Sequence, residues 1–352
     1  MAGDNEVRLL FVIAGLRNGG AERVLSVVSN ALCNENEVHL AVLEDDLKLY
    51  EFNATIHYLK NKYHDKNFRF IRKILALQEC FKQVNPDVII SFIDWTNVLC
   101  VIANYNLKFK HIATEHHAHD YLKSAKFRLV RDMAYRHVDM LSVLNKTDFE
   151  YYDFVKNKVI LHNPLFLSAD ELLEKQNVIL SIGRLEHVKG FDLFFRALAM
   201  IDDEILSSYK VLVVGDGRLK NELKKLCDSL NLNVEFLGHQ SDVGKFYKIA
   251  KVVVVASRSE GFCNVLAEAG AFGCVRITSD TAGSRELVKN GIDAIVFENE
   301  NFHELGEALR LVLSDEALVN TLSKNSKNSV KELSPEKIVQ KWSEMIRKVV
   351  KK

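Results

Sequence analysis

The stretch Val252–Gly270, VVVVASRSEGFCNVLAEAG, decides the fold that this sequence predicts. Four consecutive valines are typical of a strand that is buried on both faces of a sheet. A polar loop follows them, and a helix is expected to begin near Asn264. Strand, loop and helix in this order form the repeating unit of a parallel α/β sheet, in which ligands bind at the carboxyl ends of the strands.

Short apolar runs alternate with longer helical patterns along the rest of the chain. Six strands are expected in each half, which predicts an α/β protein of two doubly wound domains facing each other across a cleft. Pro164 breaks the pattern, so we expect one domain in residues 1–165 and another in residues 166–334, with a last helix, residues 335–352, that packs back on the first domain. The expected strands are Val7–Ala14, Val38–Leu43, Val88–Phe92, His111–Thr114, Met140–Val143 and Val159–His162, then Val178–Ile182, Lys210–Val214, Val234–Leu237, Val252–Ala256, Val275–Thr278 and Ala294–Phe297.

The composition is that of a folded protein without a nucleic-acid partner. The 352 residues contain 47 Lys and Arg against 47 Asp and Glu, a balance that argues against general nucleic-acid binding. No run of about 18 apolar residues occurs, and the first apolar run follows acidic residues, so neither a transmembrane helix nor a signal peptide is expected. The six cysteines form no CxxC pair, which argues against a structural zinc site and favours a reducing cytoplasm.

Two loops that follow expected strands carry residues suited to phosphate. Gly19 and Gly20 open a helix after the first strand; adjacent glycines let a ligand approach the backbone, and the start of a helix attracts anions. The segment LSIGRLEHVKG places Arg184 and Lys189 five positions apart after another strand. Two cations there suit a phosphate-bearing leaving group, because they stabilise the charge that grows as its bond breaks.

Two acids, Glu260 and Glu268, lie eight positions apart in the opening stretch. Carboxylates accept hydrogen bonds from hydroxyl groups, and the amides of Asn264 and Val265 at the start of a helix would point at an anion. Glu268 lies among apolar and small residues, so it is expected to have a buried partner. A sugar nucleotide offers hydroxyls and a diphosphate together. A glycosidase with two catalytic glutamates is an alternative, but it does not account for the two cations.

Several segments carry a resemblance to a known family. NGGAER at residues 18–23, GRLEHVKG at residues 183–190 and SEGFCNVLAEAGAFG at residues 259–273 resemble the retaining nucleotide-sugar transferases of glycosyltransferase family 4. Their fold is GT-B, and their hallmark is two glutamates separated by seven residues. More narrowly, IISFIDWTNVLCVIA, TEHHAHDYLKSAKFRLVRDMAY and DMLSVLNKTDFEYY resemble the N-acetylgalactosamine transferases of bacterial protein N-glycosylation, which extend a lipid-diphosphate-linked oligosaccharide.

The resemblance implies roles for the residues that match its motifs. Arg184 and Lys189 would hold the donor diphosphate, Glu260 the hydroxyls of the donor sugar, and Glu268 the ribose. Residues 166–334 would then bind the nucleotide sugar and residues 1–165 the acceptor. The donor-binding residues implied in this way are Gly19, Gly20, Gly183, Arg184, Lys189, Glu260, Gly261, Asn264, Val265 and Glu268.

A histidine is also implied by the resemblance. His116 matches the family's active-site histidine near the transferred sugar, and His117 and His119 are the alternatives. The family needs neither a metal nor a cofactor, and the spacing of the three histidines is not that of a zinc site, so neither is expected. The catalytic residues implied are His116, Arg184, Lys189 and Glu260.

Cations are in excess between Lys60 and Arg136, with 14 Lys and Arg against 7 Asp and Glu. They alternate with apolar residues, a pattern typical of amphipathic helices that bind anionic membranes. The same cations would also bind the diphosphate of a lipid-linked acceptor. The residues expected to do so are Arg69, Arg72, Lys73, Lys123, Lys126, Arg128 and Arg131.

With the resemblance, these features predict a retaining glycosyltransferase of bacterial glycan assembly. It is expected to move N-acetylgalactosamine from UDP-GalNAc, in α linkage, onto a lipid-diphosphate-linked oligosaccharide. The protein would be cytoplasmic and peripheral at the cytoplasmic face of the inner membrane. The alternatives are a transferase for lipopolysaccharide or capsule sugars with another nucleotide sugar, a sugar-nucleotide epimerase of the same fold, and a non-catalytic sugar-nucleotide binder.

Overall fold

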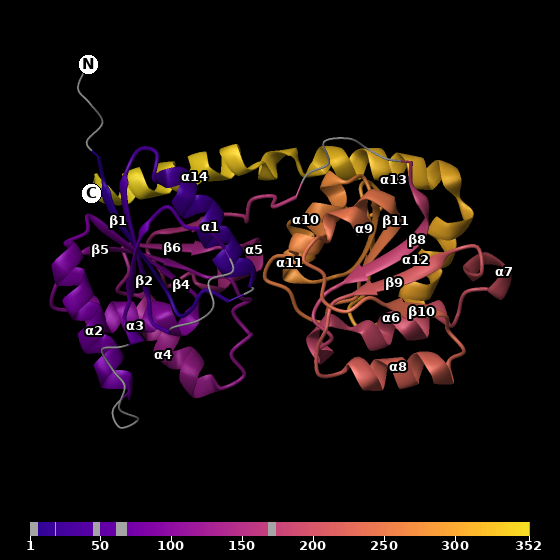
Figure 1. Ribbon diagram of the computed structural model, residues 1–352, viewed down its shortest axis with the longest axis horizontal. Helices are drawn as coiled ribbons and strands as arrows, with labels where there is room; N and C mark the ends of the chain where they lie inside the picture. The colour runs from indigo at the N-terminus through magenta and orange to yellow at the C-terminus, as the bar shows by residue number, and fades with distance from the viewer. Residues whose placement is uncertain (1–5, 18, 45–49, 61–68, 168–173, 352) are drawn as a thin grey trace, which may run out of the picture. The chain divides into compact units, whose positions relative to one another are not determined.

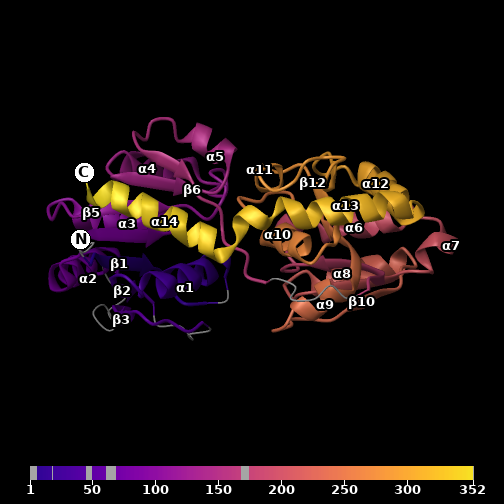
Figure 2. The ribbon, with the colours of Figure 1, turned by 90° about the horizontal axis from the view of Figure 1, so that it is seen from above.

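The computed structural model describes the chain apart from residues 1–5, 18, 45–49, 61–68, 168–173 and 352. The chain divides into two compact units. Unit 1 comprises residues 1–164 and 335–352, and unit 2 comprises residues 165–334. Each unit is built on one parallel sheet with helices on both faces (Figures 1 and 2). The predicted fold class, two parallel α/β domains, is therefore confirmed.

The sheet of unit 1 has the strand order β3-β2-β1-β4-β5-β6-β7, with every pair parallel. The order reverses between β1 and β4, which is where ligands bind in open parallel sheets. Its strands are β1 Arg8–Ile13, β2 Glu37–Val42, β3 Thr55–Tyr58, β4 Val88–Phe92, β5 Lys110–Thr114, β6 Met140–Val143 and β7 Lys158–Ile160.

The helices of unit 1 form two layers over this sheet. α2, α3 and α4 are consecutive neighbours on one face, and α1 and α14 pack together on the other (Figure 1). These helices are α1 Gly20–Leu32, α2 Arg69–Val84, α3 Asp94–Asn104, α4 Ala125–Tyr135, α5 Lys146–Tyr151 and α14 Pro335–Val350.

The six strands expected in unit 1 are present, and β3 is an additional one. Its sequence, TIHY, contains no apolar run because β3 is an edge strand whose side chains are exposed or half-buried. Apolar pattern alone does not identify such a strand, since an edge strand buries little surface.

The sheet of unit 2 has the order β10-β9-β8-β11-β12-β13, and its six strands are the six expected from the sequence. The valine run lies in the central strand β11, where Val252, Val253 and Val254 are fully buried. The strands are β8 Gln176–Ile182, β9 Lys210–Val214, β10 Val234–Phe236, β11 Ala250–Val255, β12 Val275–Ser279 and β13 Ile295–Phe297. The helices are α6 Phe191–Leu198, α7 Asp203–Leu206, α8 Lys220–Ser229, α9 Gly244–Ile249, α10 Asn264–Ala271, α11 Ala282–Arg285, α12 Phe302–Ser314 and α13 Glu316–Ser329.

The helix α14 follows unit 2 in the chain but contributes to the core of unit 1. Its apolar side chains Trp342 and Ile346 are buried, and the helix contacts β4, β5 and α1. The indole ring of Trp342 stacks on Phe92, the last residue of β4, with ring centroids 5.9 Å apart. Among the described residues, no helix has the length and hydropathy that a membrane span requires.

Candidate active site

Lys189 and Glu260 meet at the carboxyl edge of the sheet of unit 2. Lys189 ends a short 3₁₀ helix after β8, and Glu260 lies in the loop after the neighbouring strand β11. Nζ of Lys189 is 2.5 Å from Oε1 of Glu260, which also accepts a hydrogen bond from Ser257 at 2.7 Å. The two side chains are 24% and 13% exposed. Burial by itself lowers the pKa of Lys189, but the carboxylate of Glu260 outweighs it, and the pKa lies above its usual value.

The two loops that carry this pair are fastened together. Gly190 has a φ of 65°, and a Cβ there would lie 1.9 Å from the carbonyl oxygen of Ala256, so only glycine allows this approach. Arg258 donates to both carboxylate oxygens of Asp192, at 2.9 and 2.7 Å, and to the carbonyl of His187 at 2.7 Å. The position of Lys189 is therefore fixed from both sides of its loop.

Gly183 and Arg184 lie beside the same pair. Gly183 directly follows β8, and a Cβ there would contact the side chain of Lys189 at 3.6 Å. Arg184 is exposed, and its charge lowers the pKa of Lys189 slightly against the effect of Glu260. The turn Gly215–Gly217 packs on this loop, because a Cβ at Gly215 would lie 1.9 Å from the carbonyl of Gly183. The GxG sequence is explained by this close packing.

Helix α10 begins at Asn264, as expected, and carries the second glutamate. Its N-cap residue, Cys263, makes no side-chain capping hydrogen bond. Glu268 is 5% exposed and accepts a hydrogen bond from the hydroxyl of Tyr247 at 3.0 Å. Burial, and then the adjacent carboxylate, raises the pKa of Tyr247 well above its usual value. The buried partner expected for Glu268 is therefore Tyr247.

In unit 1, the glycines after β1 lie at the start of helix α1. Gly19 is its N-cap residue and Gly20 its first residue. A Cβ at Gly19 would collide with the carboxylate of Glu22, at 2.1 Å, so the absence of a side chain leaves room for that acid. Gly20 is exposed.

His116 lies at the carboxyl end of β5 in an aromatic stack. Its ring lies 4.9 Å from that of Phe92, which in turn stacks on Trp342 of α14. The hydroxyl of Thr114 donates its hydrogen to the carbonyl of Ser91. The hydroxyl oxygen of Thr114 is therefore left to accept, and Nε2 of His116, 3.3 Å from it, is placed to donate. Nδ1 is then an acceptor, and it is buried without a hydrogen-bond partner among the described residues. Burial, and then the neighbouring His117, lowers the pKa of His116 to about 3, so its imidazole is neutral at neutral pH.

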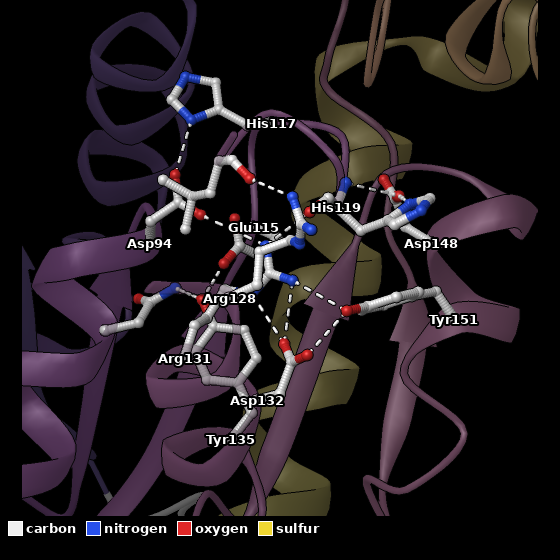
Figure 3. Close-up of polar contacts among 12 residues, drawn as sticks. Asp94, Glu115, His117, His119, Arg128, Arg131, Asp132, Tyr135, Asp148 and Tyr151 are labelled. Carbon is white, nitrogen blue, oxygen red and sulfur yellow. Dashed lines mark hydrogen bonds and ion pairs between the residues drawn. The ribbon is translucent and has the colours of Figure 1, made fainter. Parts of the chain in front are cut away.

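The other two histidines each face an aspartate. Nδ1 of His117 lies 3.0 Å from Asp94, and its ring stacks on Tyr121 at 4.1 Å. Nδ1 of His119 lies 2.7 Å from Asp148, which also accepts from the backbone amide of His119 (Figure 3). Asp94 follows Ile93, whose φ of 72° is strained for a β-branched residue. The chain is therefore bent sharply where it presents Asp94 to His117.

A buried arginine holds the loop that carries these histidines. Arg131 of α4 is 1% exposed and donates to the carbonyl of His119 at 2.8 Å and to Asp132 at 2.9 Å (Figure 3). Arg128, one turn earlier, donates to the carbonyl of Leu122 at 2.8 Å in the same loop. Glu115, beside His116, is fully buried with the hydroxyl of Tyr135 bonded to it. Burial, and then the carboxylate of Asp94, raises the pKa of Glu115 well above its usual value.

No grouping of three or more His, Cys, Asp or Glu side chains suited to a metal ion occurs in the part of the chain that the structure describes. What the arrangement offers instead is a fixed cation, Lys189, paired with Glu260, a second carboxylate, Glu268, on α10, and a neutral imidazole, His116, in unit 1. A cation binds phosphate by charge, and carboxylates and a neutral imidazole bind hydroxyls by hydrogen bonds.

Comparisons with known proteins agree with this chemistry. The family described as "Glycosyl transferases group 1" matches residues 166–329. A Campylobacter jejuni protein named GalNAc-alpha-(1->4)-GalNAc-alpha-(1->3)-diNAcBac-PP-undecaprenol alpha-1,4-N-acetyl-D-galactosaminyltransferase is 35% identical, over 97% of this chain and 99% of the relative. The chain belongs to the group 1 glycosyltransferases.

A second relative and a solved structure are also similar to this glycosyltransferase. Another Campylobacter jejuni protein, N-acetylgalactosamine-N,N'-diacetylbacillosaminyl-diphospho-undecaprenol 4-alpha-N-acetylgalactosaminyltransferase, is 27% identical over 94% of this chain and 97% of the relative. The crystal structure of Anabaena Alr3699/HepE in complex with UDP and glucose has a TM-score of 0.83 at 16% identity, over 97% of this chain and 100% of that one. The fold is therefore GT-B.

Within unit 2 of the glycosyltransferase, the residues singled out from the sequence come together at one edge of the sheet. Gly183, Arg184 and Lys189 lie after β8, and Glu260 and Gly261 lie after β11. Asn264, Val265 and Glu268 follow on α10.

The basic residues of unit 1 that were expected to bind a lipid-linked diphosphate differ in their exposure and in their partners. Arg131 was expected on a cationic surface, and this is wrong, because its guanidinium is buried among acids and holds the histidine loop. Arg128 is half-buried and bonds the same loop. The others lie on the surface or at its edge: Lys123 and Lys126 are exposed, Arg69 and Lys73 pair with Glu44, each at 3.1 Å, and Arg72 is half-buried.

Sequence reasoning missed residues that support the site rather than line it. Gly190, Ser257 and Tyr247 hold Lys189, Glu260 and Glu268, respectively; Gly190 ends the GRLEHVKG motif, but its sequence alone does not show the close approach to Ala256. Asp94 and Glu115 were also missed, although an acid directly before a histidine pair, as in TEHH, is a signal for a buried polar cluster.

Proposed function

We propose that this glycosyltransferase moves N-acetylgalactosamine from UDP-GalNAc, with retention and in α linkage, onto a lipid-diphosphate-linked saccharide. The 35% identical Campylobacter relative, which by its name is an α-1,4-N-acetylgalactosaminyltransferase of an undecaprenol-diphosphate-linked saccharide, supports the sugar and the acceptor class. The observation that carries the proposal is the pairing of Lys189 with Glu260 at the carboxyl edge of the sheet of unit 2.

The donor diphosphate takes Lys189 as its main cation, and Arg184 as the second. When the diphosphate binds, it replaces Glu260 as the partner of Lys189 and frees that carboxylate to accept hydrogen bonds from the donor sugar. Glu268, held by Tyr247, accepts from the ribose hydroxyls. The amides at the start of α10 face the diphosphate.

The reaction breaks the bond between the anomeric carbon and the diphosphate oxygen while the acceptor hydroxyl bonds to the same carbon from the same face. The acceptor's proton passes to the leaving phosphate oxygen, so no separate base is required. Lys189 and Arg184 stabilise the negative charge that grows on that oxygen. Gly20, which is exposed and adds no side chain at the start of α1, lets the phosphate approach the backbone, whereas the space beside Gly19 is taken by Glu22.

His116 binds the transferred sugar as a neutral acceptor. Its pKa of about 3 keeps the imidazole uncharged, and its buried Nδ1 has no partner among the described residues, so a sugar hydroxyl or amide can donate to it. The aromatic stack of Phe92 and Trp342 fixes the plane of the ring. We therefore propose His116 for the active-site role, because the Nδ1 atoms of His117 and His119 already face aspartates.

The acceptor's lipid places the enzyme at an anionic membrane surface, at the cytoplasmic face of the inner membrane. Of the cations expected there, Lys123 and Lys126 are exposed, and Arg69, also exposed, pairs with Glu44. Arg72 and Lys73 lie with Arg69 on α2. Each exposed cation near an anionic surface contributes about 1 kcal/mol to binding.

A pair of lysine variants tests the proposal. Lys189→Ala should lower turnover with UDP-GalNAc and a lipid-linked acceptor about 10²- to 10³-fold, because a preorganised charge is lost from the transition state. Lys220→Ala is the matched control: Lys220 also pairs with a carboxylate in unit 2, Asp216 at 2.8 Å, and is 32% exposed, so turnover should change less than about twofold. Equal losses in the two variants would refute the role of Lys189.

The donor and the reaction type need their own measurements. Thermal-shift screening against UDP-, GDP- and ADP-sugars should show stabilisation by UDP-GalNAc, and mass spectrometry should show an N-acetylhexosamine added to the lipid-linked acceptor. Conversion of the donor in the absence of any acceptor would instead indicate an epimerase.

A further inference from the structure

The exposed large apolar side chains of the described residues are distributed unequally between the two units. Twelve of the fourteen lie in unit 1, and only Ile292 and Leu311 lie in unit 2. The two units have the same architecture, so unit 2 serves as an internal reference for an ordinary surface. Most of the twelve lie on α2, α3 and α4, the three neighbouring helices that cover one face of the sheet (Figure 1).

Helix α4 is inverted relative to an ordinary surface helix. It turns Arg131 inward, at 1% exposure, together with Ala134 and Tyr135, and turns four of its apolar side chains outward. A helix at a water-facing surface normally buries its apolar stripe and exposes its charges. The outward residues are Phe127 at 47%, Leu129 at 61%, Val130 at 41% and Met133 at 59% exposure.

The inversion has a physical cause in the cluster beneath the helix. Arg131 is held inward by the carbonyl of His119 and by Asp94, and Tyr135 is held by Glu115 (Figure 3). These polar contacts fix which face of α4 points at the protein, so the outward face is fixed as well. Since a contiguous apolar patch on a soluble surface marks an interaction site, the outward face of α4 needs a partner.

The surroundings of the patch indicate the class of partner. Trp95 of α3 is 39% exposed and contacts Phe127 edge-on, with ring centroids 5.3 Å apart. Among the exposed ionic side chains of residues 120–136, the cations Lys123, Lys126 and Arg136 outnumber Asp120, the one acid. An apolar helix face bordered by tryptophan and lysines is the pattern of a helix that lies in the interface of an anionic bilayer.

We propose that the outward face of α4, together with Trp95, inserts into the interfacial layer of an anionic membrane. This inference rests on the proposed function, because a lipid-linked acceptor gives the enzyme a reason to be at the bilayer. It differs from binding by surface cations alone, because Arg128 and Arg131 face inward and the outward residues of α4 between them are apolar. Lys123, Lys126 and Arg136 contact the headgroups around the inserted side chains.

The chain carries its own reporter for this test. It has two tryptophans, and Trp342 is 2% exposed, so a change on vesicle binding comes from Trp95. With vesicles of equal parts phosphatidylethanolamine and phosphatidylglycerol, the emission should shift to the blue and should be quenched by brominated acyl chains. The variant Trp95→Phe should lose that response.

Paired variants then test the apolar face itself. Leu129→Gln with Met133→Gln should lower the vesicle-bound fraction at least about tenfold, since two large apolar side chains lose their burial. The control, Ile292→Gln with Leu311→Gln in unit 2, changes side chains of similar exposure, 55% and 51%, and should bind vesicles as the unchanged protein does. The unfolding midpoint of both variants should stay unchanged, because all four side chains are exposed.

Three results would overturn the proposal. One is flotation with vesicles while Trp95 remains open to aqueous quenchers. Another is equal binding by the two paired variants. The third is sedimentation that shows a dimer which the variant Leu129→Gln with Met133→Gln breaks, because the face would then join two copies of the chain.

Turnover of a water-soluble acceptor analogue separates this inference from the proposed function. The same double variant of α4 should leave that turnover unchanged. Absent turnover in the unchanged enzyme would contradict only the proposed function.

Discussion

The Lys189–Glu260 ion pair can be tested by measuring how much it stabilises the protein and whether a bound diphosphate replaces Glu260 as the partner of Lys189. The perturbations are Lys189→Met, Glu260→Gln and the two together. Each single change leaves one mostly buried ionic group without its partner, whereas the double change removes both charges. If the pair exists as described, the double variant should therefore be more stable than the sum of the single effects predicts.

The size of the effect follows from the burial of the pair. Removing one partner of a fully buried ion pair costs about 3–5 kcal/mol of unfolding free energy. Here the side chains of Lys189 and Glu260 are 24% and 13% exposed, so each single variant should lose about 2–3 kcal/mol. The double variant should also lose about 2–3 kcal/mol rather than twice that amount, which gives an interaction energy of about 2–3 kcal/mol.

Urea unfolding of the four proteins measures this energy, and repeating it with UDP tests the exchange of partners. UDP should stabilise the unchanged enzyme by about 1.5–3 kcal/mol more than it stabilises Lys189→Met, the value of a hydrogen bond to a charged group. Single effects that add within about 0.5 kcal/mol would show that the pair is not formed. Equal stabilisation by UDP in both proteins would refute the contact between Lys189 and the diphosphate.

Three other predictions concern the framework of the site. Gly190→Ala should lower the free energy of urea unfolding by more than about 3 kcal/mol, because φ is 65° and a Cβ would lie 1.9 Å from the carbonyl oxygen of Ala256. The control is Gly291→Ala, which has a φ of 71° but no atom within 4 Å of the added Cβ, and it should cost about 1 kcal/mol. Similar costs in the two variants would contradict the close approach at Gly190. Burial lowers the pKa of His111 from 6.5 to about 4, so stability is full above pH 6.5 and falls as the pH drops toward 4. The loss in unfolding free energy between about pH 7 and about pH 5 should be smaller by about 2 kcal/mol in His111→Asn, and an unchanged pH dependence would argue against a buried neutral imidazole. Glu115→Gln should change stability at neutral pH by less than about 1 kcal/mol, because burial and then Asp94 raise the pKa of Glu115 and so favour the uncharged carboxyl, which an amide resembles; a loss above about 2 kcal/mol would indicate an ionised group.

The sheets could be predicted because their strands are buried on both faces. Runs such as Val252–Val255 have no polar residue to conflict with that assignment, and the glycines beside them mark turns. The strand β3 was missed because Thr55–Tyr58 lies at an edge, where half-exposed side chains carry no distinctive pattern. Strand prediction from one sequence works where burial is complete and fails where it is partial.

Some residues of the candidate site could likewise be predicted from the sequence, and others could not. Lys189, Glu260 and Glu268 could be found because they lie in loops and helix starts that directly follow strands, where topology alone brings them together. The inward direction of Arg131 could not be found, because it depends on the carbonyl of His119 and on Asp94, which come from other segments of the chain. Alternating basic and apolar residues fix the period of a helix, but they do not fix which side of it faces the protein.

The helix α14 has a consequence for how the chain is made. Because Trp342 completes the packing around Phe92 and His116, unit 1 cannot finish folding until residues 335–350 have left the ribosome. Residues 165–334 emerge earlier and contain all of their own sheet, so unit 2 can reach its native state first. Any nascent chain that stalls between these two points would carry a finished unit 2, while Phe92, the ring on which His116 stacks, would lack the indole of Trp342 on its other side.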